Sequence, residues 1–329
     1  MSRAQLTSTV EQNTGGAVAP FVAGKNFIAN GGFDIWQRGT SGFTTSGYMA
    51  DNWYSVTAGT TTFSQDTDVP SGVPVQYSMK WVTSASSSFG QYIVSLEQAV
   101  VKPLRGQTLT LSIWLKTASY GSGNLILRAN YSNSSDARTN QTTTVGSDTI
   151  ITGTTPTSWT KLTKTFTMPS DAVGISLLLI PDTAQGSGVT VKATAMQLEL
   201  GSVPTPFSRA GGTLQGELAL CQRYYYRQTA QTAYSLFGSG IAYSTTAING
   251  YVKFPVTMRT APYGALDTSS NLGVYDGANL ISATFALNTL NTLDIGSVVA
   301  TSSGLTQWRP YHFISNNSTS SYIGFSAEL

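Results

Sequence analysis

The stretch Leu109-Thr-Leu-Ser-Ile-Trp-Leu-Lys116 alternates apolar and polar side chains over most of its length. Alternation with a period of two places its leucines and isoleucine on one face of a β-strand and Trp114 on the other. A strand with one apolar face suits a sheet that packs against the core on a single side. The stretch therefore predicts an antiparallel sheet in which Trp114 points away from the core.

Similar short segments, rich in β-branched and aromatic residues, recur on both sides of this stretch. Clusters of Gly, Ser, Asn and Pro separate several of them. Many short strands divided by turn residues favour an antiparallel sandwich of two sheets, and we expect a jelly roll. The expected strands in this region cover 75–82, 89–94, 109–116, 124–131, 159–166, 173–180 and 189–200.

The pattern along the chain divides it into four segments, and the predicted fold class is all-β. One short helix is expected after Thr213, because threonine is a good N-cap residue. Beyond that helix, strand-like segments return and continue to the last residues. We predict an extended N-terminal arm over 1–24, a jelly-roll sandwich over 25–208, a linker with the short helix over 209–233, and a second, smaller β domain over 234–329.

Composition excludes several classes of protein. Only 10% of the 329 residues are charged, against about 25% in an average globular protein. The net charge of +2 comes without a basic run, so we expect no nucleic-acid partner. The single cysteine and single histidine leave no disulfide framework and no Cys/His zinc cluster. Every apolar run is too short to cross a bilayer, so membrane insertion is not expected.

Low charge and clustered aromatics point to interfaces between subunits or domains. Large interfaces are depleted in charged residues and enriched in aromatic ones. The run Tyr224-Tyr-Tyr226 is expected to begin a strand, in which the three rings cannot all face one way. At least one of them is expected at a subunit or domain interface.

Catalytic signatures are missing from the sequence, so we expect a protein that is not an enzyme. No spacing singles out a pair of carboxylates for glycoside hydrolysis. The chain has neither a Gly-x-Ser-x-Gly elbow nor a Gly-x-x-x-x-Gly-Lys phosphate loop. His312 lies in a Tyr-His-Phe strand and is interpreted as a packing residue. A glycan-cleaving enzyme is kept as the least favoured hypothesis.

Aromatic residues next to acids or amides suggest a sugar site. A sugar ring stacks its C–H face on an aromatic ring, while its hydroxyls bond to polar groups. The candidates are Trp114, Tyr131, and Trp53 with Asp51 beside it. For Trp53 the alternative is a place in the core. For the outward Trp114 the alternative to a sugar is another protomer.

A calcium site is the one metal hypothesis, and otherwise no cofactor is expected. Asp34 and Glu199 lie in the first and last segments of the expected jelly roll, which pair if the sandwich closes. Carboxylate and backbone oxygens are the ligands of structural Ca²⁺. The alternative for both acids is a satisfied hydrogen-bonding role.

The N-terminal segment differs from the rest, since it has no aromatic residue before Phe21. One interpretation is a loose terminus. The other is an arm that docks on another protein, with Leu6 and Val10 as its apolar anchors.

Several stretches together resemble a known family. They look like the carbohydrate-binding-module-like jelly roll that recurs in tail fibre and minor tail proteins of tailed bacteriophages, together with the segments that follow it there. These stretches are Asn26-Phe-Ile-Ala-Asn-Gly-Gly-Phe-Asp-Ile-Trp-Gln-Arg-Gly39, Ala50-Asp-Asn-Trp53, Met196-Gln-Leu-Glu-Leu-Gly-Ser-Val-Pro-Thr-Pro-Phe207, Glu217-Leu-Ala-Leu-Cys-Gln-Arg-Tyr-Tyr225, Val252-Lys-Phe-Pro-Val-Thr-Met-Arg-Thr-Ala-Pro262 and Ile323-Gly-Phe-Ser-Ala-Glu-Leu329.

The resemblance implies a virion protein, made in the host cytoplasm, that binds a host-surface glycan or receptor through a concave β-face or edge loops. It also implies a homotrimer, which the low charge favours independently, and attachment to other phage virion proteins through the N-terminal arm. The alternative is a capsid-decorating head fibre with a mainly structural role.

Overall fold

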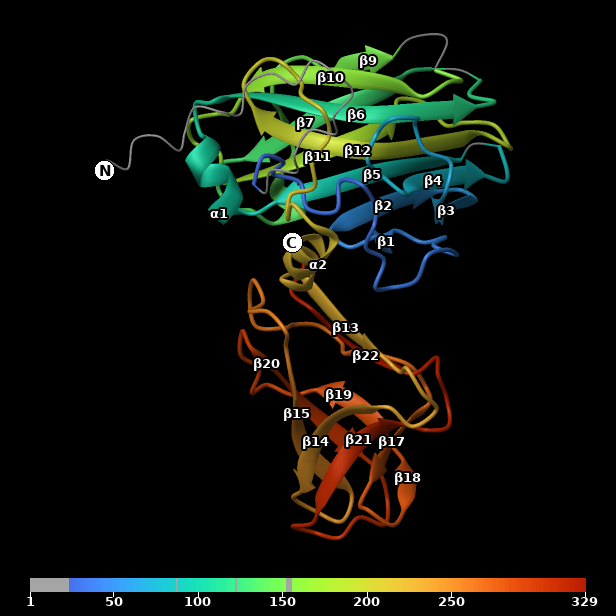
Figure 1. The fold of residues 1–329 in the computed structure, drawn as a ribbon, viewed down its shortest axis with the longest axis vertical. Helices are drawn as coiled ribbons and strands as arrows, with labels where there is room; N and C mark the ends of the chain where they lie inside the picture. The colour runs from blue at the N-terminus through green and yellow to red at the C-terminus, as the bar shows by residue number, and fades with distance from the viewer. Residues whose placement is uncertain (1–23, 87, 122, 152–155) are drawn as a thin grey trace, which may run out of the picture.

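Two antiparallel sheets packed face to face form the N-terminal part of the molecule (Figure 1). The structure is a computed structural model that describes residues 24–86, 88–121, 123–151 and 156–329. The proposed anchors Leu6 and Val10 lie outside the described residues. The predicted all-β class with an antiparallel sandwich is confirmed.

The sheet that contains the stretch 109–116 has five strands. Its register places Leu109, Leu111, Ile113 and Leu115 in the core, each at most 1% exposed, and leaves Trp114 half-buried on the outer face. In spatial order its strands are β10 (Thr160–Thr167), β6 (Thr108–Ala118), β12 (Thr190–Leu200), β4 (Ser78–Thr83) and β3 (Thr61–Asp66).

The facing sheet has seven strands. Its central strands β5 and β11 are rich in apolar residues, and their inward residues belong to the main core. In spatial order the strands are β1 (Gly47–Tyr48), β2 (Trp53–Ala58), β5 (Phe89–Leu96), β11 (Gly174–Pro181), β7 (Leu125–Ser132) and β8 (Thr143–Thr144), while β9 (Thr149–Ile151) also pairs with β7.

The connections make this sandwich a jelly roll. From β4 to β7 the chain changes sheet with every strand, and it does so again from β10 to β12. Strands that are consecutive in sequence therefore face each other, and strands distant in sequence lie side by side. Strand β12 thus pairs with both β6 and β4, which brings residues of these three strands side by side on the outer face of the sheet.

Aromatic side chains from both sheets fill the core. Trp53, Trp81, Phe63 and Tyr92 are each at most 1% exposed. Phe63 on β3 meets Tyr92 on β5 edge to face, with 5.5 Å between ring centroids. Burying each such side chain contributes roughly 1.5–3 kcal/mol, so these rings hold the two sheets together.

The opening segment of the jelly roll pairs with its closing strand. The Asn26 side chain donates to the Met196 carbonyl at 3.0 Å and accepts from the Leu198 amide at 3.1 Å. Strand β12 bulges between Thr194 and Gln197. A Cβ at Gly31 would lie 2.1 Å from the Met196 carbonyl oxygen, so this approach requires glycine.

Helices are short in the described residues, and none of them is long and apolar enough to span a membrane. They are α1 (Gln98–Val101), the 3-10 turns η1 (Lys102–Leu104) and η2 (Arg138–Asn140), and α2 (Leu214–Gln222). The predicted cap of α2 is confirmed, because the Thr213 hydroxyl accepts from the Gly216 amide at 3.0 Å. Glu217 and Cys221 form the buried face of α2.

The C-terminal domain contains two further antiparallel sheets around a second core. The first has the order β13 (Tyr225–Thr229), β22 (Tyr322–Ser326) and β16 (Asp267–Thr268). The second has the order β18 (Leu280–Ser282), β17 (Leu272–Tyr275), β21 (Pro310–Ser315), β14 (Leu236–Ala242), β15 (Ala247–Lys253), β20 (Ile295–Thr301) and β19 (Thr284–Leu287).

The chain enters and leaves this domain at the same place, beside the jelly roll (Figure 1). Strand β13, within the segment expected as a linker, pairs with the last strand, β22. Gln37 of the jelly roll donates to the Tyr225 carbonyl at 2.7 Å, and Tyr48 donates to the Leu329 carbonyl at 2.6 Å. The Arg38 guanidinium lies 3.4 Å from the centroid of the Tyr225 ring, so Tyr225 is a domain-interface tyrosine, as expected.

Candidate functional site

Three lysines lie in one row across the outer face of the five-stranded sheet. Lys192 on β12 is the direct cross-strand partner of Lys116 on β6 and of Lys80 on β4. Like charges placed directly opposite one another destabilise a sheet. The repulsion between these lysines must therefore be offset by other charges, unless a ligand offsets it.

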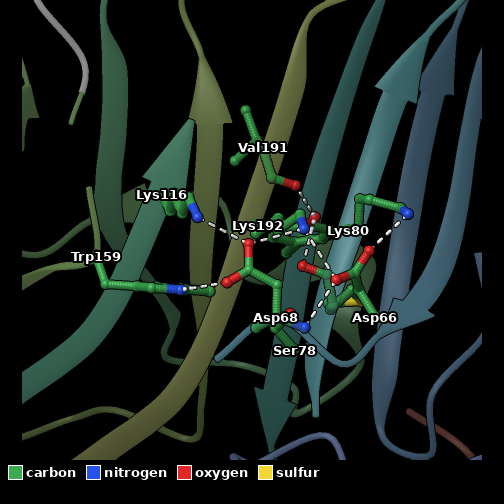
Figure 2. Close-up of polar contacts among 10 residues, drawn as sticks. Asp66, Asp68, Ser78, Lys80, Lys116, Trp159, Val191 and Lys192 are labelled. Carbon is green, nitrogen blue, oxygen red and sulfur yellow. Dashed lines mark hydrogen bonds and ion pairs between the residues drawn. The ribbon is translucent and has the colours of Figure 1, made fainter. Parts of the chain in front are cut away.

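Two aspartates offset most of the charge of this row (Figure 2). Asp66 accepts from Lys80 at 2.6 Å and from Lys192 at 2.9 Å. Asp68 accepts from Lys116 and Lys192, each at 2.9 Å. These three lysines and two aspartates, which we call the lysine row, have a net charge of +1.

Trp159 completes the lysine row. Its indole Nε1 donates to Asp68 at 3.0 Å, and Figure 2 shows the ring extending beside the carboxylate. The ring is half-buried, which leaves part of its surface open to solvent. Charged groups and an aromatic ring thus share one patch of an otherwise Ser/Thr-rich sheet.

Hydrogen bonds hold Asp66, Asp68 and Lys192 in their charged forms. Partial burial raises the pKa of Asp66, but hydrogen bonds from Lys80 and Lys192 outweigh it and lower the pKa to about 2. Burial likewise raises the pKa of Asp68, yet the bonds from Lys116, Lys192 and Trp159 bring it well below its usual range. The same bonds raise the pKa of Lys192 against the effect of its burial.

The sheet surface is hollowed at the lysine row. A hollow of about 390 Å³ opens there, within the range of about 300–1,000 Å³ that is typical of small-ligand sites. Ammonium groups with spare hydrogens and carboxylates can bond to hydroxyls, and the excess positive charge suits an acidic group. The residues lining the hollow are Asp68, Lys80, Val82, Lys116, Thr117, Ala118, Thr190 and Lys192.

Trp114 lies on the same face as the lysine row, and Tyr131 does not. Trp114 faces out from β6, two residues before Lys116, and packs against the small cluster of Val75, Ala195 and Phe207. Tyr131 belongs to β7 of the other sheet and packs against the main core. The two rings therefore cannot form one sugar platform.

Asp51 and Trp53 are buried, which removes them from the candidate glycan site. Asp51 is 0% and Trp53 1% exposed. The Asp51 carboxylate accepts from the Gln37 backbone amide at 3.1 Å, and the Trp53 indole donates to the Asn30 carbonyl at 3.0 Å. A sugar at the surface reaches neither side chain, so the core alternative holds for Trp53.

Asp34 and Glu199 bind different partners, although their segments do pair in space. Asp34 forms a two-bond ion pair with Arg209, at 2.7 and 3.2 Å. Glu199 accepts from the Gln197 side chain at 2.8 Å and from the Thr205 amide at 2.9 Å. Within the described ranges, no three His, Cys, Asp or Glu side chains are grouped to hold a metal.

The residues of the lysine row were not among the sequence-based candidates. The sequence contains a signal for them, because Lys80 alternates with the inward Met79 and Trp81, and Lys116 follows Trp114 by two residues in the same strand. Lysines at outward strand positions stand out in a chain this poor in charge. Their alignment into one row depends on which strands are neighbours, and the sequence does not show that.

Comparison with known proteins gives structural likeness only. No protein-family model matches the chain, and no curated protein matches its sequence. It is similar to the enzymatically active domain of tailspike protein 4 from bacteriophage CBA120, with 12% identity and a TM-score of 0.39. That match covers 54% of this chain and 21% of the tailspike chain.

Carbohydrate-binding modules are also among the similar structures. The C-terminal family 22 module of Clostridium thermocellum Xyn10B has 14% identity and a TM-score of 0.32, over 54% of this chain and 99% of the module. The xylan-binding CBM22-1 domain of Paenibacillus barcinonensis Xyn10C has 12% identity and a TM-score of 0.33, over 55% and 98%. At these identities and TM-scores the function must be argued from the residues of this chain.

Proposed function

We propose that this chain is a phage virion protein, of the tail fibre or minor tail type, that binds a host-surface glycan through the lysine row. The observation that carries the glycan site is the cross-strand alignment of Lys116, Lys192 and Lys80 over a surface hollow. The two aspartates offset most of the charge of this row, and the remaining charge of +1 and the spare ammonium hydrogens at the hollow are available to a ligand.

The ligand class follows from the charge and from the neighbouring rings. The net charge of +1 favours a glycan with carboxylate groups, such as one containing uronic acid. Trp159 beside Asp68, and Trp114 on the same face, offer ring surface to the apolar side of a sugar. The two aspartates can accept hydrogen bonds from sugar hydroxyls while keeping the lysines in place.

Replacing Lys192 by alanine is expected to weaken binding of a uronic-acid oligosaccharide by about tenfold to a hundredfold. Lys192 is the central member of the row, and its loss makes the patch neutral. Hydrogen bonds to charged groups contribute about 1.5–3 kcal/mol, which converts to this loss of affinity. Titration calorimetry against a panel of acidic and neutral oligosaccharides measures the effect.

Lys102→Ala is the matched control, because Lys102 is an exposed lysine of the same domain outside the lysine row. It should bind as the original chain does. Equal affinity of Lys192→Ala and the original chain for every acidic probe would refute the proposed site. Release of reducing ends during the titration would show that the chain cleaves glycan and is an enzyme.

Deleting residues 1–24 is expected to abolish incorporation into phage particles while leaving glycan binding unchanged. The deletion removes the proposed anchors Leu6 and Val10 and keeps every residue of the lysine row. Particles assembled with a tagged chain, purified and probed for the tag, measure incorporation. Undiminished incorporation would mean that the arm is not the attachment segment, and imaging of the tag would separate a tail position from a head fibre.

A further inference from the structure

The C-terminal domain has a hollow of its own on the outer face of its seven-stranded sheet. Its volume is about 580 Å³, larger than that of the hollow at the lysine row. Two of its lining residues, Tyr234 and Leu236, are 57% and 56% exposed. The full lining is Tyr234, Leu236, Tyr275, Leu280, His312 and Ile314.

His312 is exposed in this hollow, so its interpretation as a packing residue is wrong. The reason is strand alternation, since Tyr311 and Phe313 on either side are 2% and 0% exposed and occupy the core. Alternation then turns His312 outward. The sequence showed the apolar neighbours but not which face of β21 was buried.

Directly opposed residues extend the hollow into a row across the sheet. Tyr275 on β17 pairs with His312 on β21, His312 with Ser239 on β14, and Ser239 with Tyr251 on β15. Directly opposed residues share a face, and neighbouring strands lie about 4.8 Å apart. Tyr251 is 56% exposed. Two tyrosine rings thus flank a histidine and a serine along a line across four strands.

The row differs in charge from the lysine row of the jelly roll. None of the residues that line the hollow is Lys, Arg, Asp or Glu. The nearby acid Asp276, which follows Tyr275 in sequence, is paired with Arg309 at 3.1 Å. An acidic ligand therefore finds no countercharge among the residues that line the hollow, whereas a neutral ligand needs none.

We propose that this hollow and its row form a second binding site, which takes a short neutral oligosaccharide lying across the strands. Tyr234, Tyr275 and Tyr251 supply rings for the C–H faces of the sugars. The His312 nitrogens, the Ser239 hydroxyl and the tyrosine hydroxyls supply partners for sugar hydroxyls. A concave site with mostly apolar walls and a few polar groups is typical of small-ligand binding.

A second copy of the chain is the competing occupant, and the local geometry favours the sugar. A stable interface buries about 800 Å² on each partner and has a well-packed apolar centre. Here the centre is hollow, and the row across it is rich in hydroxyls and imidazole. The proposal is independent of the lysine row, which lies in the other domain and favours an acidic ligand instead of a neutral one.

The test is titration calorimetry with maltotetraose, cellotetraose and mannotetraose on the full chain and on single variants. Tyr234→Ala and His312→Ala remove exposed side chains of the hollow, so both variants should fold. At least one tetrasaccharide should bind the original chain, and each variant should bind it at least fivefold more weakly. Lys192→Ala should bind it unchanged, which separates this site from the one in the jelly roll.

Leu290→Ala is the matched control, because Leu290 is 70% exposed and lies outside the hollow. It should bind as the original chain does. Absence of binding to all three sugars at millimolar concentration, or equal binding by the hollow variants, overturns the proposal. A change of oligomeric state in Tyr234→Ala or His312→Ala by light scattering also overturns it, because the face would then be covered by another copy.

Discussion

Replacing Arg38 by alanine is expected to destabilise the protein by about 3–5 kcal/mol at pH 7.5, the usual cost of removing one partner of a buried ion pair. The Arg38 guanidinium lies 3.1 Å from Glu328, whose side chain is 4% exposed. It also stacks on Tyr225 with 3.4 Å to the ring centroid. The variant leaves the buried Glu328 carboxylate without its ion-pair partner at the junction of the two domains.

The stability that Arg38→Ala loses should be smaller at lower pH. Burial raises the pKa of Glu328 to about 7 and that of Asp51 to about 6, even though Arg38 acts to lower both. In the unfolded chain such groups titrate near pH 4. Between about pH 4 and 7 the folded state thus binds more protons, so these two groups make stability fall as pH rises through that window. At pH 5.5 both carboxyls are largely neutral and need Arg38 less.

Urea unfolding at pH 7.5 and 5.5 measures both effects. We expect the deficit of Arg38→Ala at pH 5.5 to be less than half of its value at pH 7.5. The double variant Arg38→Ala/Glu328→Gln should recover part of the loss, because it buries no unpaired Glu328 charge. Arg309→Ala should change stability little, because the Arg309 side chain is 43% exposed and the Asp276 carboxylate keeps the hydrogen bonds from the Ala278 and Asn279 amides. A deficit that does not depend on pH would mean that packing on Tyr225, and not charge, makes Arg38 necessary.

Replacing Trp53 by alanine is expected to cost about 3–5 kcal/mol of stability, as for other large aromatic truncations in a core. The Trp53 ring meets Phe33 with 4.5 Å between centroids, and its indole bonds to the Asn30 carbonyl. Its loss would open a cavity between the sheets and remove one of the two hydrogen bonds to that carbonyl, which also accepts from the Phe33 amide. Any effect on glycan binding should come only through the fraction of unfolded chain.

Trp53→Phe keeps most of the ring volume and should lose less stability than Trp53→Ala. It provides a variant that can be measured if Trp53→Ala does not fold. Trp308→Ala is the matched control, because Trp308 is 71% exposed, and its stability should stay within about 0.5 kcal/mol of the original. Unfolding midpoints and glycan titrations on the same samples distinguish a role of Trp53 in core stability from a role in glycan binding. Weaker glycan binding by a fully folded Trp53→Phe would return Trp53 to the binding site.

Local periodicity predicted the strands well. The alternation over 109–116 placed its apolar residues in the core and Trp114 outside, and Thr213 capped α2 as expected. For Asp51 and Trp53, local sequence patterns could not predict the role of the side chains. They occupy a stretch whose composition suits either a sugar site or a core, and only the packing of the first segment against β2 and β5 decides between them.

The sequence by itself determined the class of fold, because the direction of a side chain in a strand depends only on its immediate neighbours. Which strands become neighbours depends on hydrogen bonds between segments far apart in the chain. Only the tertiary structure could therefore align Lys80, Lys116 and Lys192 in one row, turn His312 outward beside Tyr275, and bring Arg38 to Glu328.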